Sequence, residues 1–317
     1  MELVSVVIAN WNGMEYVGTC LERVFRQTYS PIEVVVVDNG STDGSSAFIK
    51  ARYPQVFLIK NCENRGFAAG YNAAIKASRG TYVLALNTDV FVEKTFVSEA
   101  VKKLRLGERI GAVAPKILQH GTGHIQYVGV YLRKRISMVN SDNCDREELV
   151  FGTSGAAVLY RREMLEGIKL FGEYFDETYF SFGEDIDLSW RAQLYGWKAV
   201  YAPEAVAHHV GSGSLQGRVR LVDKPAFFQR HVLKNRYMTI TKNCSLGIFL
   251  YLFPYLLLTE VLTWPYFLMR TPLKVPYLLL SIYDYFHMLP STLMKRAVIH
   301  RNRKVDDRYI RQFFRGF

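Results

Sequence analysis

Short apolar runs alternate with helix-like segments over the first 90 residues, and this alternation constrains the fold more than any other feature of the sequence. The apolar runs have the length of strands that are buried on both faces: 3–9, 32–37, 56–59 and 82–86. The segments between them have helical spacing or small residues: 14–27, 45–52 and 64–77. Strands that alternate with helices predict a doubly wound α/β sheet whose first strands are parallel.

Polar residues follow these predicted strands at their carboxyl ends. Asn10 follows the first strand and Asp38 follows the second. Asn87 and Asp89 follow the fourth. Right-handed crossovers place the strand-to-helix loops of such a sheet on one edge, where open α/β sheets bind their ligands. We therefore expect Asn10, Asp38 and Asp89 to line one cleft. The structural alternative is a polar turn, with Asp89 as a turn former or a helix N-cap.

Three acidic residues stand at the head of another predicted helix, directly after a group of aromatic residues. They are Glu184, Asp185 and Asp187. The helix dipole favours acids in the first turn, which explains one or two of them on structural grounds alone. A cluster of three exceeds what a helix start requires, so we interpret this segment as a second chemical site.

Two further segments have features of a binding site. The small residues at 152–157 allow either the close approach of a ligand or tight packing of a strand on a helix. His208 and His209 stand beside a glycine–serine segment at 211–214. A histidine is more often structural than a ligand, but a nearby cation site would favour ligation. After the first 90 residues, we predict an amphipathic helix at 95–106. Three strands of a more mixed region are predicted at 110–114, 125–132 and 149–159.

The last third of the chain is both basic and apolar. Residues 214–317 carry 17 Lys/Arg and 5 Asp/Glu, whereas residues 1–213 carry 23 and 24. This combination favours an anionic membrane surface as a partner. It argues against nucleic acid, which would require the charge on a folded recognition module. We therefore divide the chain into residues 1–225 and a helical, membrane-contacting region, residues 226–317.

The apolar run at 246–269 is long enough to cross the ~30 Å apolar core of a bilayer as a helix. However, Glu260 interrupts it, and Pro254 and Pro265 would kink it. A second apolar run, 275–289, is too short to span. Three arrangements stay open: a half-inserted membrane contact, a true span, and a helical subdomain or homodimer interface.

The first residues lack the pattern of a signal peptide, and the cysteines are scattered without metal-ligand spacing. Both observations lead us to expect a cytoplasmic protein with reduced thiols, peripheral to the inner face of the cell membrane.

Seven motifs stand in a fixed order between residues 3 and 214: SVVIANWNG, VVVVDNGSTDG, NRGFAAGYN, LALNTD, GTSGAAVLYRR, GEDIDLSWR and HHVGSGS. In this order they resemble the family 2 glycosyltransferases, the inverting group with the GT-A fold, and most of all their bacterial rhamnosyltransferase-type branch. The resemblance implies an α/β fold of the GT-A nucleotide-diphospho-sugar transferase type: a doubly wound mixed sheet in residues 1–225 with a C-terminal helical, membrane-associating extension. The segment after residue 227, with Lys234, Asn235 and Arg236, resembles the helix that follows the catalytic part in this family.

The resemblance also implies roles for individual residues around a nucleotide-sugar donor and a divalent cation, Mg²⁺ or Mn²⁺. The residues on the donor side are Asn10, Asn12, Asp38, Gly66, Phe67, Asn72, Asn87 and Asp89. Asp89 is the last residue of the DxD motif and the expected metal ligand, while Asn87 departs from its first acid and loses a charge. His209 is the second expected ligand, with His208 as the less favoured choice.

The expected catalytic base is Asp185, with Glu184 and Asp187 as rivals. Gly155, Trp190 and Arg191 are assigned to the acceptor side. A sugar hydroxyl is a poor nucleophile near neutral pH, so a carboxylate close to its proton accelerates the attack by about 10²–10⁴-fold. The cation neutralises the diphosphate that departs from the donor.

The function that the resemblance implies is transfer of a sugar from deoxythymidine-diphosphate rhamnose or a UDP-sugar to a glycan acceptor, of which a lipid-linked saccharide in cell-surface polysaccharide synthesis is the favoured kind. Two alternatives are a sugar-phosphate nucleotidyltransferase and a non-catalytic, membrane-docked binding protein. The first would require a glycine- and arginine-rich phosphate loop near the first strand, which the sequence lacks. The second would need neither Asp89 nor Asp185. A dinucleotide oxidoreductase would require G-x-G-x-x-G after the first strand, where NWNG stands instead.

Overall fold

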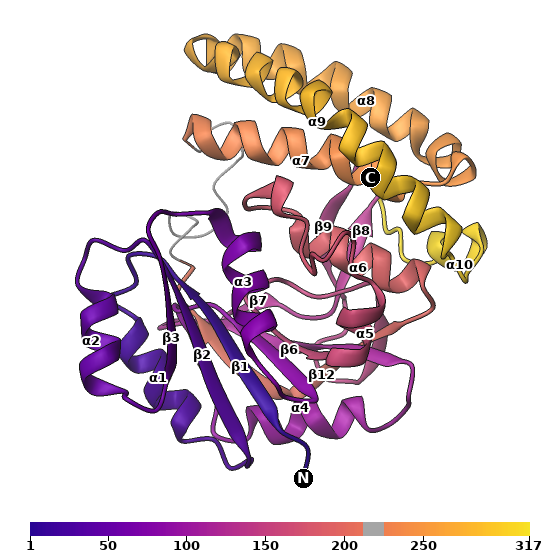
Figure 1. The fold of residues 1–317 in the computed structure, drawn as a ribbon. Coiled ribbons are helices and arrows are strands. Elements are labelled where there is room, and N and C mark those ends of the chain that lie inside the picture. Colours follow the sequence, from indigo (N-terminus) through magenta and orange to yellow (C-terminus); the bar gives the residue numbers. More distant parts are fainter. Residues whose placement is uncertain (212–224) are drawn as a thin grey trace.

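The computed structural model describes residues 1–211 and 225–317. A mixed sheet forms the centre of the first range (Figure 1). Its strands are β1 (Val4–Asn10), β2 (Ile32–Asn39), β3 (Phe57–Asn61), β4 (Tyr82–Leu86), β5 (Val90–Val92), β6 (Ile110–Gln119), β7 (Ile125–Tyr127), β10 (Glu148–Val150), β11 (Ala157–Arg161) and β12 (Lys198–His209). Their order is β10-β12-β6-β11-β4-β1-β2-β3, with β5 paired to β12 and β7 to β6. A separate hairpin consists of β8 (Val130–Arg133) and β9 (Ser137–Asn140).

The first half of the sheet is parallel, as the alternation of strands and helices predicts. Strand β1 pairs in parallel with β2 and with β4, and the register places Asn10 opposite Asp38. Strand β11 runs antiparallel to β4, with Ala157 opposite Leu86. The carboxyl ends of β1, β2 and β4 therefore meet the amino end of β11 at one edge of the sheet. All residues of β4 are buried, which explains why its sequence is a continuous apolar run.

Helices cover both faces of this sheet. They are α1 (Val17–Phe25), α2 (Ser45–Arg52), α3 (Gly66–Ala77), α4 (Phe96–Leu104), α5 (Arg162–Gly167), α6 (Glu184–Leu194) and the short 3-10 turn η1 (Glu177–Tyr179). Helices α1, α2 and α4 bury one face, and α3, α5 and α6 bury the other. Because side chains alternate along a strand, Val34 and Val36 belong to the first core and Val35 and Val37 to the second.

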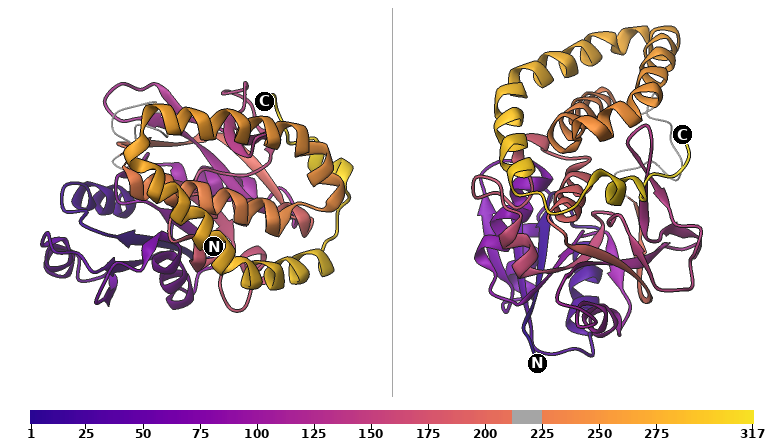
Figure 2. Two further views of the ribbon diagram at one scale, coloured as in Figure 1. Left: turned by 90° about the horizontal axis from the view of Figure 1, so that it is seen from above. Right: turned by 90° about the vertical axis from the view of Figure 1, so that its right-hand side faces the viewer.

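The C-terminal helices form a layer at one end of the α/β part (Figure 1 and Figure 2). They are α7 (Ala226–Asn243), α8 (Leu246–Arg270), the 3-10 turn η3 (Pro272–Lys274), α9 (Val275–Arg301) and α10 (Asp307–Arg311). Helix α7 lies between the α/β part and the pair α8 and α9. Leu233 of α7 packs with Phe267 of α8 and Leu278 of α9. The end of the chain then returns to the α/β core, where Phe313 and Phe314 are buried.

Several predicted elements differ from those of the structure. The strand expected at 149–159 is divided into β10 and β11, and the one at 125–132 into β7 and β8. Between β10 and β11, Gly152 pairs with Val130, and it packs against α6, where a Cβ at this position would lie 2.4 Å from the Cβ of Ser189. Helix α9 extends to Arg301, well beyond the apolar run that we expected at 275–289. The two prolines of α8 lie inside a continuous helix.

Candidate active site

The loops after β1, β2 and β4 meet at the edge predicted from the strand order. The buried Asn10 Nδ2 donates to Asp38 Oδ1 at 2.9 Å. Asn12 ties the same two loops together, because its Oδ1 accepts from the backbone N–H of Thr42 at 2.8 Å. Gly13 lies against the third loop, since a Cβ there would be 3.3 Å from Thr88 Oγ1. These contacts bring together three loops that carry residues predicted for the donor side.

Strand β12 delivers His209 to the loop that holds Asp89. The His209 Nε2 atom lies 3.3 Å from the Asp89 carboxylate, and both side chains are largely buried. The backbone N–H of Val210 donates to the Asp89 carbonyl at 3.0 Å, which fixes this end of β12 beside the loop. On its other side, His209 Nδ1 lies 2.7 Å from Gln126 Oε1. Because a side-chain amide oxygen accepts hydrogen bonds, Nδ1 is the donor in this contact, and the other ring nitrogen, Nε2, faces Asp89.

This pair of side chains fits a divalent cation. A carboxylate oxygen and an imidazole nitrogen are suitable ligands, and a cation would replace their direct contact. Within residues 1–211 and 225–317, no group of three or more His, Cys, Asp or Glu side chains could hold a metal ion. Among the described residues, Asp89 and His209 are the pair that could hold such an ion, and a bound diphosphate and water would complete its shell. Ser212, Gly213 and Ser214 of the HHVGSGS motif lie outside the described residues.

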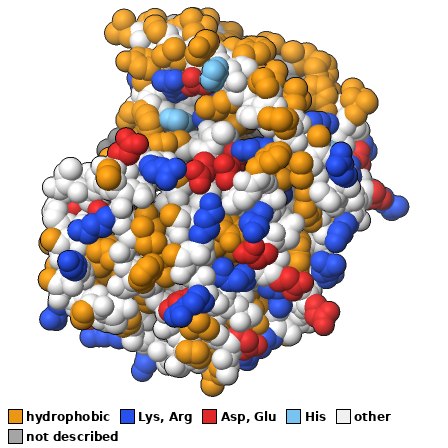
Figure 3. All heavy atoms as spheres, viewed as in Figure 1, with side chains coloured by type: hydrophobic (Ala, Val, Ile, Leu, Met, Phe, Trp, Pro, Cys, Tyr) orange, Lys and Arg blue, Asp and Glu red, His pale blue; other side chains and the backbone are white. Residues whose placement is uncertain are grey.

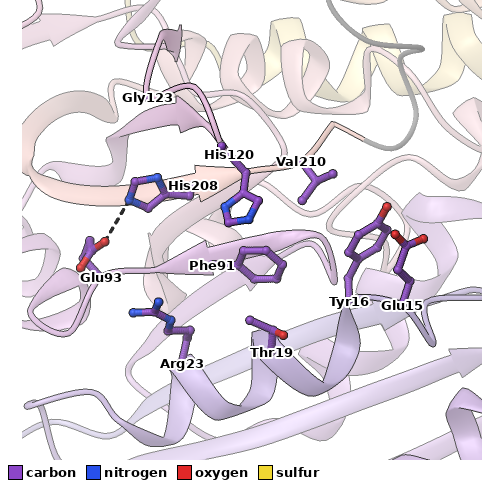
Figure 4. A pocket seen from close by; sticks show the side chains of 11 residues that line it. Glu15, Tyr16, Thr19, Arg23, Phe91, Glu93, His120, Gly123, His208 and Val210 are labelled. Carbon is purple, nitrogen blue, oxygen red and sulfur yellow. Dashed lines mark hydrogen bonds and ion pairs between the residues drawn. The ribbon is translucent and has the colours of Figure 1, made fainter.

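The two neighbouring histidines face opposite sides of β12. His208 Nε2 lies 2.9 Å from Glu93 Oε1, and His208 lines a cavity of about 710 Å³ (Figure 4). The cavity is bounded by α1, β5 and the loop after β6. Successive strand side chains point to opposite faces, so His208 cannot share the Asp89 site with His209. The structure thus separates the two histidines that the sequence left as alternatives.

Asp185 lies in the first turn of α6 with its carboxylate held by backbone donors. Its Oδ2 accepts from the N–H of Gly155 at 2.9 Å, and its Oδ1 from the N–H of Ile186 at 2.8 Å. Burial raises the pKa of Asp185 to about 6, and these hydrogen bonds limit the rise. Burial, together with the charge of Asp185, raises the pKa of Glu184 to about 8. Of the two, Asp185 is therefore the acid that is ionised near neutral pH.

Asp187 does not belong to this site, and its assignment as a rival base is corrected. Its side chain is fully buried and lies 3.0 Å from Arg191 and 2.9 Å from Lys242. Asn243 donates to the same carboxylate at 2.8 Å. Burial alone would raise the pKa of Asp187, but Lys242 and Arg191 lower it below its usual range. A carboxylate with these partners cannot take a proton from an acceptor.

Trp190 and Arg191 are also corrected, because both are fully buried and cannot contact an acceptor. Trp190 packs edge-on against Phe151 and Phe314. Arg191 donates to the carbonyls of Ile168 and Tyr174, in addition to its ion pair. Both residues follow Asp185 in the GEDIDLSWR motif and serve the packing of α6. Gly155, in contrast, lies directly against Asp185.

The donor-side helix α3 contributes three of the predicted residues. Gly66 has a φ of +87°, and the ring of Phe180 lies 2.6 Å from the position of a Cβ, so no other residue fits. Phe67 lies near Gly155, where a Cβ would be 3.5 Å from its ring. Asn72 is buried, donates to the Phe175 carbonyl at 2.8 Å and accepts from the Phe175 N–H at 2.9 Å. Its assignment to the donor is therefore corrected to a structural bridge.

Tyr71 contacts the loop that holds Asp89 and was missed by the sequence analysis, although it lies within the NRGFAAGYN motif. Its hydroxyl donates to Asn87 Oδ1 at 2.9 Å. Burial raises the pKa of Tyr71 well above its usual value. The backbone N–H of Asn87 also donates to Ala156, next to Gly155. The Asp89–His209 pair and the Asp185 carboxylate thus lie along the same edge of the sheet.

Comparison with known proteins identifies the family. The model of "Glycosyl transferase family 2" matches residues 5–168. The chain is 27% identical over 241 residues to N-acetylglucosaminyl-diphospho-decaprenol L-rhamnosyltransferase of Mycobacterium tuberculosis, which covers 66% of this chain and 76% of that protein. It is 33% identical over 102 residues to an Escherichia coli UDP-Glc:alpha-D-GlcNAc-diphosphoundecaprenol beta-1,3-glucosyltransferase, covering 32% of this chain and 41% of that enzyme.

The chain spans only 15–41% of the length of the curated relatives that it matches at 32–33% identity. Among solved structures, the mannosyltransferase PcManGT of Pyrobaculum calidifontis, in complex with GDP-Man and Mn²⁺, superposes with a TM-score of 0.57. The match covers 95% of this chain and 87% of that one at 18% identity, a likeness of fold. The chain thus has the GT-A fold and belongs to glycosyl transferase family 2.

Proposed function

We propose that this glycosyltransferase moves a sugar from a nucleoside-diphosphate sugar to a hydroxyl group of a lipid-linked glycan, with inversion at the anomeric carbon. The observation that carries the proposal is the placement of the Asp89–His209 pair and of Asp185 along one edge of the sheet. The relatives named above act, by their names, on N-acetylglucosaminyl diphosphates of long-chain lipids. Their sugars differ, so deoxythymidine-diphosphate rhamnose and UDP-sugars are the donors to compare first.

Asp89 and His209 would hold Mg²⁺ or Mn²⁺ in this reaction. Such an ion, when bound, neutralises the negative charge that gathers on the departing diphosphate. The residues of the chain supply its position: Gln126 fixes the tautomer of His209, and β12 fixes the distance of the ring from Asp89. The Mn²⁺ in the mannosyltransferase structure supports a cation on this fold.

Asp185 would act as the general base. Its pKa of about 6 leaves it ionised at pH 7 and still basic enough to accept a proton as the acceptor hydroxyl attacks. The N–H of Gly155 holds the carboxylate in a fixed orientation. Attack on the face opposite the diphosphate, in one displacement, would invert the anomeric centre.

The C-terminal helices would contact an anionic membrane surface. Within the described residues, α8 is the one helix long and apolar enough to cross a bilayer. Its exposed large side chains recur at helical spacing, and the apolar atoms gather over α8 and α9 (Figure 3). Glu260 points inward, where it contacts Arg236 and accepts from Tyr237 Oη at 2.6 Å. The charge that interrupts the apolar sequence thus contacts α7 instead of the outer face, which favours a membrane contact, half-inserted or spanning, over a soluble subdomain.

We therefore propose residues 1–225 as the catalytic part and residues 226–317 as the membrane-contacting extension, at the cytoplasmic face of the cell membrane. A lipid-linked acceptor has its diphosphate and first sugars at the membrane surface. An enzyme that rests on this surface through α8 and α9 meets the acceptor without extracting its lipid. A homodimer through the same face is the alternative, and the vesicle experiment below separates the two.

Asp185→Asn should lower kcat by about 10²-fold or more, because an amide of the same shape cannot take the proton. Donor affinity should change little. The assay measures release of nucleoside diphosphate from a panel of sugar nucleotides, with an N-acetylglucosaminyl diphosphate on a hydrocarbon chain as acceptor. Glu184→Gln is the matched control and should retain most activity. Equal losses in the two variants would remove Asp185 as the base.

Activity should fall as the pH is lowered through about 6, because the base acts only when it is ionised and burial has raised the pKa of Asp185 to that region. Below this pH, kcat/KM should decrease about tenfold per pH unit. If the base were an exposed carboxyl group with an ordinary pKa, the enzyme would keep nearly full activity at pH 5. A flat profile between pH 5 and 7, measured with the same donor and acceptor, would contradict the assignment.

Removal of divalent cations with EDTA should abolish transfer, and added Mn²⁺ or Mg²⁺ should restore it. Asp89→Asn and His209→Ala should each raise the Mn²⁺ concentration needed for donor binding by about tenfold or more, because each removes one of two protein ligands. Thermal shift with the sugar nucleotide measures binding without turnover. His208→Ala is the control, since this ring faces the other side of β12. An equal effect of both histidine variants would refute the site.

Full-length protein should float with phosphatidylglycerol vesicles and less with phosphatidylcholine vesicles. The double variant Leu250→Glu, Leu257→Glu should bind at least about tenfold more weakly, because both side chains lie on the exposed face of α8 and each buried leucine is worth about 1.5–3 kcal/mol. Phe57→Glu is the control at an exposed apolar position of the α/β part. Unchanged flotation of the double variant, with loss of a dimer in sedimentation, would favour the homodimer instead.

A further inference from the structure

The loop that leads into the proposed base has an unusual backbone. Phe180 has a φ of +62° and Phe182 a φ of +74°, and Gly183 follows with +89°. Residues with side chains rarely adopt positive φ, and bulky aromatic residues least of all. A loop of this kind keeps its shape only where surrounding groups hold it. Asp185 lies two residues after the last of these positions, so the shape of the loop fixes where α6 and its first turn begin.

A single amide from the C-terminal helices holds this loop. The Nδ2 atom of Asn235, on α7, donates to the carbonyls of Tyr179 at 3.0 Å, Ser181 at 2.8 Å and Phe182 at 2.7 Å. The side chain is 1% exposed. Its Oδ1 atom has no hydrogen-bond partner among the described residues, so the amide acts here through its N–H groups. Because the three carbonyls bind the same nitrogen, this one side chain fixes their positions relative to one another.

Other residues on the same face of α7 contact the same segment. The ring of His231 stacks on Phe180, with centroids 5.3 Å apart. Thr239 Oγ1 lies 2.8 Å from the hydroxyl of Tyr179. Positions 231, 235 and 239 are four residues apart and form one stripe along the helix. The stripe runs along the loop, and Asn235 lies at its centre.

The loop also contacts the donor side of the site. The carbonyl of Phe180 accepts from the N–H of Ala68 at 3.2 Å, and its ring fills the space above Gly66. Asn235 therefore acts on a segment that is packed against α3 at one end and continues into α6 at the other. The catalytic part alone does not contain this constraint, since α7 follows residue 225.

We propose that Asn235 is a positioning residue, which holds the loop at 180–183 and thereby sets Asp185 toward the acceptor. The inference rests on the proposed role of Asp185 as base. It also gives the membrane-contacting extension a second role, because α7 joins α8 and α9 to the catalytic loop. A displacement of about 1 Å at a reacting group can cost about 10²-fold in rate, so loss of the amide should affect turnover more than binding.

The test compares Asn235→Asp and Asn235→Ala with Leu233→Ala in the full-length protein. The aspartate keeps the volume of the side chain and removes its N–H donors. Leu233 is buried on the opposite side of α7 against α8 and α9, so its truncation weakens the packing of α7 without removing a contact to the loop. Donor affinity, kcat, thermal stability and hydrogen–deuterium exchange of the peptide at 178–187 are measured for each.

Both Asn235 variants should lose about 10²-fold in kcat, with donor affinity within about threefold of the wild type. Exchange at 178–187 should increase in both. Leu233→Ala should lower the thermal stability about as much as the Asn235 variants do. Its kcat and the hydrogen–deuterium exchange of its 178–187 peptide should match those of the wild type. A wild-type kcat in folded Asn235→Ala, beside an inactive Asp185→Asn, would overturn the inference and leave the proposed function intact. An active Asp185→Asn beside an impaired Asn235→Ala would instead remove Asp185 as the base and keep the positioning role.

Discussion

The pairing of β11 with β4 is the constraint on which the site depends. The two strands run antiparallel, so the start of β11 meets the end of β4 and places Gly155 and Ala156 beside Asn87. The same start of β11 presents the Gly155 N–H to the Asp185 carboxylate. The loop that holds Asp89 and the Asp185 carboxylate, nearly 100 residues later in the chain, thus share one edge of the sheet. The pairing of the strands sets this geometry, and the hydrogen bonds of Asn87 and Gly155 hold the loops in place.

A buried group of charges fixes the C-terminal helices to this frame. Lys242 of α7 lies 2.5 Å from Asp176 and 2.9 Å from Asp187, and Lys295 of α9 lies 2.6 Å from Asp176. Although burial opposes its ionisation, the pKa of Asp176 is held far below its usual range by these two lysines. Loss of one partner from such a buried group typically costs about 3–5 kcal/mol, because a charge is left without compensation. The extension is thus bound to the α/β part by interactions that specify one arrangement, in addition to apolar packing.

Acids of similar sequence context have different chemistry here because their surroundings differ. Asp187 is neutralised by cations from α6 and α7, while Asp185 has only backbone donors and retains a raised pKa. Glu184 has no hydrogen-bond partner at its Oε2 within the described residues, and its pKa is raised further. Three acids within four positions therefore differ in pKa: that of Asp187 is lowered, and those of Asp185 and Glu184 are raised to about 6 and about 8. The helix dipole alone would lower the pKa of all three acids, because all three lie in the first turn of α6.

The sequence by itself determined the class of fold, the edge of the sheet that holds the site, and the family, because strand alternation and motif order are local properties of the chain. It also singled out Asp89 and Asp185, whose roles stay proposals, and the apolar run that forms α8. Only the tertiary structure decided that Asp187, Trp190, Arg191 and Asn72 are buried, and that His209 rather than His208 faces Asp89. Burial and facing depend on partners such as Lys242 and Gln126 that lie far away in sequence. A motif records which residues recur together, whereas contacts between distant segments determine which of them remain accessible to a ligand.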